Sequence, residues 1–144
     1  MDFSQFDSRA AADEGRDMHV KHPATGELMY DNGEPCLVRV LGTESRSVQA
    51  EIAKVRAAKV AEGQEDEKTL AELHERLVDA ARPLVAGFPS GIHRGKRKAK
   101  APDDVDWFLT LQMVNGRPDE KSFAEQIAEF STRRAHFLGV PSKG

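Results

Sequence analysis

The sequence is poor in cysteine and in aromatic residues, and it contains no long apolar run. Its single cysteine, Cys36, excludes an internal disulfide framework and fits a reducing compartment. The longest apolar stretches, such as 84–86 and 107–109, fall far short of the roughly 20 residues that a membrane-spanning helix needs. Residues 1–9 lack the basic and apolar segments of a secretory signal. We therefore expect a soluble protein that stays where it is made and has no membrane partner.

Length and charge narrow the class of protein further. A chain of 144 residues is long enough for one domain, and we expect a single domain over 1–144. The net charge of -3 argues against a general nucleic-acid coat, for which a basic chain is expected. The charge is uneven, because residues 1–90 carry 11 basic and 17 acidic groups while residues 91–144 carry 10 and 7. Most of the positive charge lies in one run over 94–100.

The N-terminal third predicts an arm followed by β structure. Residues 1–17 form the arm, in which the alanine-rich segment 8–15 predicts a short helix. Residues 18–41 contain three short apolar or β-branched runs, separated by turn signals at 23–26 and 32–33. Three short strands joined by tight turns predict a small antiparallel meander over 18–41.

From residue 45 onward, apolar residues recur every three or four positions, which indicates helices over 45–139. The second helix carries Leu70, Leu73 and Leu77 on one stripe. The expected helices cover about 45–63, 67–81, 102–114 and 118–138, and a loop covers 89–102. The predicted fold class is therefore α+β, mainly helical: a small N-terminal antiparallel β meander followed by about four α-helices.

The residues carry no signature of an enzyme or of a metal centre. His19 and His22 point to opposite faces of a predicted strand, and the other histidines are scattered. The sequence has neither a Gly-x-Ser-x-Gly motif nor a phosphate-binding glycine loop. Acidic residues at the start of a helix are favoured by the helix dipole, which explains Asp103, Asp104 and Asp106 without catalysis. We expect a protein that is not an enzyme and that uses no metal and no cofactor.

The basic run places five positive charges in seven residues, and two interpretations stay open. The charges are Arg94, Lys96, Arg97, Lys98 and Lys100. The run has no interleaved aromatic residues that could stack on bases, and acidic residues follow it. A flexible solvated loop is the simplest interpretation. The alternative is a binding segment for nucleic acid, for an acidic protein or for the chain's own acidic half.

Three further segments carry a resemblance to a known family. The segments are residues 80–88, residues 103–111 with Trp107, and residues 121–139. They resemble tail assembly chaperones of long-tailed bacteriophages in the spacing of their apolar residues. The third segment also shares the family's ending, here Arg-Ala-His-Phe-Leu-Gly. Residues 23–28 also resemble the start of proteins in this family, so that the resemblance spans roughly 20–139. The long basic loop departs from the family's pattern.

The resemblance implies a non-enzymatic protein of the host-cell cytoplasm. It implies that the chain binds the tape measure protein, keeps it soluble and helps to recruit tail-tube subunits. A long helical client with one apolar side aggregates without cover, and an apolar groove suits its binding. The candidate groove residues, of which the phenylalanines and the isoleucine are most simply core, are Trp107, Leu111, Phe123, Ile127, Phe130 and Phe137. A homo-oligomer stays open, and the alternative function is a small nucleic-acid-associated accessory protein that uses residues 94–100.

Overall fold

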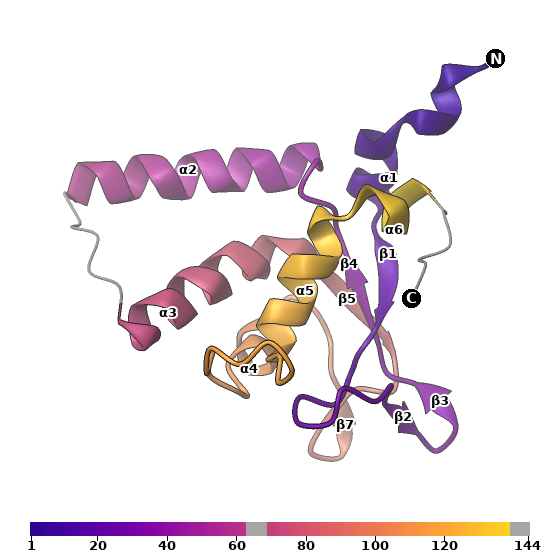
Figure 1. Cartoon of the computed structure of the whole chain (residues 1–144), viewed down its shortest axis with the longest axis vertical. Coiled ribbons are helices and arrows are strands. Elements are labelled where there is room, and N and C mark those ends of the chain that lie inside the picture. The colour runs from indigo at the N-terminus through magenta and orange to yellow at the C-terminus, as the bar shows by residue number, and fades with distance from the viewer. Residues whose placement is uncertain (63–68, 139–144) are drawn as a thin grey trace.

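The structure is a computed structural model that describes the backbone of residues 1–62 and 69–138 and the side chains of residues 1–57 and 69–138 (Figure 1). It is a mixed α+β fold, 46% helical and 19% strand. Within the described residues, six α-helices and seven strands in three small sheets are present. The predicted fold class, mainly helical with a single N-terminal meander, is therefore wrong, because strands return after the second long helix.

The central sheet has three antiparallel strands in the order β1–β4–β5. Strand β1 (Arg16–His19) pairs with β4 (Leu37–Val40), and β4 pairs with β5 (Val85–Ser90). The third strand, β5, thus comes from a segment for which the sequence predicted only a short apolar stretch leading into a loop. Its pairing partner is remote along the chain, and no local pattern marks such a pairing.

The N-terminal meander is also different from the prediction. Between β1 and β4 the chain forms an isolated bridge, Lys21 with Leu28, and then a separate hairpin of β2 (Tyr30–Asp31) and β3 (Glu34–Pro35). The turn of that hairpin lies at Asn32 and Gly33, which both adopt positive φ angles, as the Asn-Gly signal indicates.

Residues 89–102 are not one loop. Strand β5 runs to Ser90, and a second small hairpin follows, formed by β6 (His93–Arg94) and β7 (Arg97–Lys98). The basic run therefore forms this hairpin and the residues just after it.

The helices before the basic run lie close to their predicted places. They are α1 (Ser8–Glu14) after the 3₁₀ helix η1 (Phe3–Phe6), then α2 (Arg46–Glu62), and α3 (Leu70–Ala81) with the 3₁₀ turn η2 (Arg82–Leu84). The side chain of Asp7, rather than that of Ser8, caps α1 by accepting from the Ala10 amide. The predicted boundary between the two long helices falls in 63–68, outside the described residues.

The helices after the basic run are shorter than predicted. The third is only α4 (Val105–Leu109), and the last is two helices, α5 (Phe123–Thr132) and α6 (Arg134–Leu138). A capping box of Ser122 and Glu125 starts α5, and extended backbone at Arg133 ends it. Apolar periodicity continues across such a break, so that it predicts one helix where two exist. Gly139, the predicted end of the resembling segment, lies outside the described residues.

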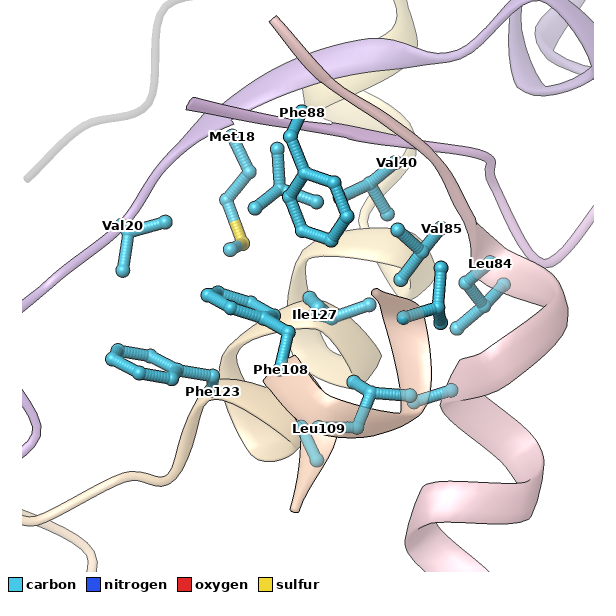
Figure 2. Close-up of a cluster of buried hydrophobic side chains, with 14 of the residues drawn as sticks. Met18, Val20, Val40, Leu84, Val85, Phe88, Phe108, Leu109, Phe123 and Ile127 are labelled. Atoms are coloured by element: carbon cyan, nitrogen blue, oxygen red, sulfur yellow. The ribbon is translucent and has the colours of Figure 1, made fainter. Parts of the chain in front are cut away.

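The core lies where helices α3, α4 and α5 pack on one face of the central sheet (Figure 2). Val38 and Val40 of β4 and Ile127 of α5 are fully buried. Phe108 links the two layers, because its ring stacks on Phe123 at 4.7 Å and meets the ring of Phe88 edge-on at 5.3 Å.

Truncation of Ile127 tests this packing. Ile127→Ala removes a fully buried side chain, so we expect the free energy of unfolding to fall by roughly 2–5 kcal/mol. Urea unfolding followed by circular dichroism measures the change. Leu73→Ala is the matched control, because its side chain is 41% exposed and we expect a loss below about 1 kcal/mol. Equal losses in the two variants would contradict the assignment of the core.

Candidate functional site

The structure divides the six candidate groove residues into two groups. Phe123, Ile127 and Phe137 are buried, with 8%, 0% and 4% of their surface exposed. They fill the protein's interior and offer no open groove. Trp107 and Phe130 are half-buried, and Leu111 is 46% exposed. The last three therefore keep apolar surface that a partner could reach.

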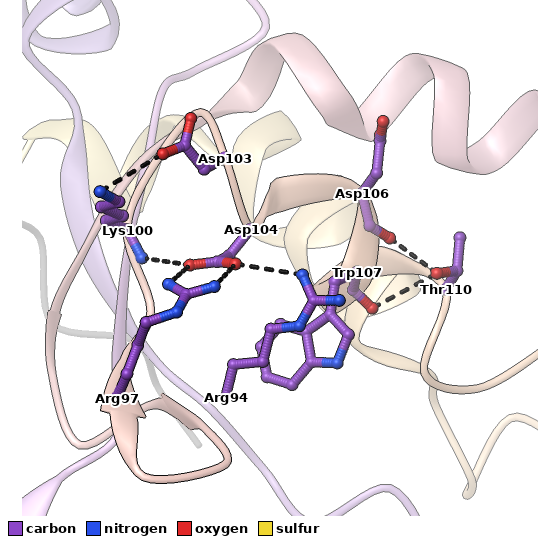
Figure 3. A network of polar contacts seen from close by, with 8 residues as sticks. All are labelled: Arg94, Arg97, Lys100, Asp103, Asp104, Asp106, Trp107 and Thr110. Carbon is purple, nitrogen blue, oxygen red and sulfur yellow. Dashed lines mark hydrogen bonds and ion pairs between the residues drawn. The ribbon is translucent and has the colours of Figure 1, made fainter.

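The basic hairpin is tied to the buried carboxylate of Asp104 (Figure 3). The guanidinium of Arg97 makes two hydrogen bonds to Asp104, at 2.6 and 2.7 Å, and Nη1 of Arg94 approaches Oδ1 at 3.3 Å. The backbone amide of Lys100 donates to Oδ2 at 2.9 Å. Four donors thus surround a side chain that has no exposed surface, and they hold the hairpin against the start of α4.

Most of the basic run is engaged within the chain. The Arg94 guanidinium also lies 5.4 Å from the centre of the Trp107 ring. The ammonium of Lys98 donates to the Pro89 carbonyl at 3.0 Å, and that of Lys100 pairs with Asp103 at 3.5 Å. Lys96, at the exposed tip, has no such partner among the described residues. The geometry therefore does not favour the nucleic-acid alternative, which needs several free cations.

These contacts determine the ionisation of Asp104. The Arg97 guanidinium, the Lys100 amide and the Arg94 guanidinium together hold the pKa of the Asp104 carboxyl well below its ordinary range, against the opposing effect of burial. The carboxylate stays charged and accepts hydrogen bonds, which suits an anchor and not a proton donor.

An uncovered apolar stripe lies on α3. Leu70 and Leu73 are 51% and 41% exposed, while Ala81 and Leu84, further along the same stripe, are buried. Figure 1 shows why: the first turns of α3 lie far from the central sheet. The sequence contained this signal in the spacing of Leu70, Leu73 and Leu77, but spacing does not tell which part of a stripe the body covers.

A cleft of about 510 Å³ lies between the chain after β1 and the helices α5 and α6. Lys21, His22 and Leu28 line one wall, and Phe130, Arg133 and His136 line the other. The side chain of Gln126 joins the two walls, because it binds both the amide and the carbonyl of Lys21 at 2.9 Å. Sequence analysis missed this cleft, because its walls come from segments remote in the chain.

The histidines of the cleft are bound to the backbone. Nε2 of His19 lies 2.7 Å from the Met29 carbonyl, and Nδ1 of His136 lies 3.0 Å from the Phe130 carbonyl.

The described residues contain no group of three or more His, Cys, Asp or Glu side chains that could hold a metal ion. In the same part of the chain, no helix has the length and apolar character needed to cross a membrane. No family model, curated protein or solved structure matches the chain.

Replacement of Asp104 tests the anchor of the hairpin. Asp104→Asn keeps the shape but loses the charge that the arginines bind, so we expect the melting temperature at pH 7 to fall by about 5–10 °C. Because the pKa of Asp104 lies below its ordinary value of 3.8 in the folded protein, this stabilisation is complete above that pH. The stabilisation is lost progressively as the pH falls from that value towards the lower pKa of Asp104 in the folded protein.

Calorimetry between pH 7 and pH 2 measures both effects. The difference between wild type and Asp104→Asn should narrow below about pH 4. Asp103→Asn is the control, because it removes an exposed carboxylate with one ion pair at 3.5 Å, and we expect a shift below about 2 °C. A difference for Asp104→Asn that stays constant down to pH 2 would contradict the role of the charge.

Proposed function

We propose that this chain is a non-enzymatic tail assembly chaperone of long-tailed bacteriophages. It binds the tape measure protein in the host cytoplasm, keeps that protein soluble and helps to recruit tail-tube subunits. Two observations support the proposal: the resemblance of residues 80–88, 103–111 and 121–139 to that family, and the uncovered leucine stripe of α3. The second observation carries it, because it identifies a surface for the client.

The stripe has the geometry that a helical client requires. Leu70, Leu73 and Leu77 recur at intervals of three and four residues, so they lie along one side of α3. The stripe begins exposed and enters the core at Ala81, so its outer part is held on a helix that the body anchors. A client helix that lays its own apolar side along this stripe covers both surfaces at once.

A second exposed apolar segment adds to this surface. Leu111 and Met113, which follow α4, are 46% and 50% exposed, and α4 packs against α3. Trp107 lies on α4 and is half-buried. Apolar side chains on α3 and after α4 therefore offer contact area beyond the single stripe. Phe123 and Ile127 belong to the core that supports α3 and α4, whereas Phe137 lies apart from it, beside Gly42.

Co-expression with a tape measure protein tests the proposal. Wild type should raise the soluble tape measure protein and co-purify with it. The double variant Leu70→Ser with Leu73→Ser removes two exposed leucines that the bound client would cover. Because each leucine buried by the client contributes about 1.5–3 kcal/mol to the binding free energy, we expect at least a tenfold loss of co-purified client.

The matched control is Tyr30→Ser, which removes an apolar ring that is 60% exposed on the β2–β3 hairpin. This variant should co-purify with the client as wild type does. Circular dichroism confirms that all variants are folded. A client that stays insoluble with wild type, or that is retained equally by the leucine variant, would contradict the proposal.

A further inference from the structure

The N-terminal arm carries an unburied pair of aromatic rings. Phe3 and Phe6 lie on η1 with their ring centres 5.6 Å apart, and they are 72% and 51% exposed. No residue of η1 is buried, and Figure 1 shows the arm extending away from the body of its own chain. Two adjacent exposed phenylalanines are unfavourable in water, which indicates a partner surface.

Acidic residues flank the two rings and are held in place. Oδ1 of Asp2 accepts from the amide and the hydroxyl of Ser4, at 2.9 and 2.7 Å, and Oδ1 of Asp7 accepts from the Ala10 amide at 3.0 Å. Each carboxylate thus uses one oxygen inside the arm, and the described contacts leave the other for a cation. The arm is a preformed acidic and aromatic segment, which lowers the entropy lost on docking.

The cleft between the chain after β1 and α5–α6 has the opposite character. Lys21 and Arg133 line it as exposed cations that have no ion-pair partner among the described residues. The two carboxylates that also line it are already paired, Asp119 with Arg117 at 3.5 Å and Glu129 with Lys121. Nδ1 of His22 accepts from the amides of Ala24 and Thr25, at 3.1 and 3.3 Å, so that Nε2 is its donor.

The cleft also offers apolar contact. The Phe130 ring stacks on His136 with centres 4.0 Å apart, and Leu28 is 47% exposed. Its volume of about 510 Å³ lies within the roughly 300–1,000 Å³ of ordinary binding pockets. Unpaired cations beside an aromatic and aliphatic lining match the two carboxylates and two rings of the arm.

We propose that the arm of one copy of this chain, residues 2–7, docks in the Lys21–Arg133 cleft of a second copy. The carboxylates of Asp2 and Asp7 face Lys21 and Arg133, and Phe3 and Phe6 cover Phe130 and Leu28. Each copy carries one arm and one cleft at different places, so the contact is head-to-tail and produces rings or filaments. This contact does not depend on the proposed function.

Sedimentation equilibrium of the full chain tests the contact. The average mass of wild type should rise above 15.9 kDa with concentration. The arm variant, Phe3→Ser with Phe6→Ser, and the cleft variant, Lys21→Glu with Arg133→Asp, should each associate at least tenfold more weakly. Lys96→Asp is the control, because it reverses an exposed cation on the basic hairpin, and it should associate as wild type does.

A mixture of the two variants decides the geometry. The cleft variant supplies an intact arm and the arm variant supplies an intact cleft, so an equimolar mixture should form a 1:1 dimer and nothing larger. Circular dichroism shows whether each variant is folded. Formation of the dimer also shows that the arm of the cleft variant and the cleft of the arm variant are correctly folded. A wild type that stays monomeric up to about 1 mM, an arm variant that associates normally, or a mixture that forms no dimer would each overturn the proposal.

Discussion

Strand β4 is hydrogen-bonded along both of its edges, to β1 on one side and to β5 on the other. Strand β1 lies in the N-terminal third of the chain, as β4 does, whereas β5 follows only after the two long helices. The β4–β5 pairing therefore closes the longest loop in the sheet, and it brings the second half of the chain onto the first. Helices α4 and α5 have a surface to cover because Val38 and Val40 stand in the middle of that sheet.

A short segment after β4 joins the helices around this sheet. The Gly42 amide donates to the Ala12 carbonyl at 3.1 Å, and the Thr43 amide donates to the Ser131 carbonyl at 3.0 Å. A Cβ atom at Gly42 would come within 2.6 Å of the Ala12 Cβ, so the close approach of α1 requires glycine there. The next residue, Glu44, accepts from Arg134 and Ser8, which lowers the pKa of its carboxyl.

Local signals in the sequence predicted local structure well. The Asn32–Gly33 turn and the helices around α1, α2 and α3 lie where turn residues and apolar spacing indicate. The errors arise where the outcome depends on remote partners. Strand β5 is defined by its pairing with β4, and the break at Arg133 interrupts an apolar pattern that continues on both sides. Nothing in the spacing of the pattern reports either event.

The candidate site shows the same division. The basic run was visible in the sequence, but its capture by Asp104 depends on the β6–β7 hairpin, which local composition did not predict. The leucine stripe of α3 was visible too, whereas its exposure depends on how far the helix extends beyond the body. The Lys21–Arg133 cleft had no linear signal, because its walls meet only in the fold.

The side chain of Gln126 has a consequence for the edge of the structure. Just beyond β1, the amide and carbonyl of Lys21 face away from the bridge to Leu28, and Gln126 satisfies both with one amide group. A free pair of this kind is where an extended segment of another polypeptide can add itself as a new strand. The glutamine imitates such a strand from within the chain. The chain thereby keeps another polypeptide from pairing with its own β structure at this point.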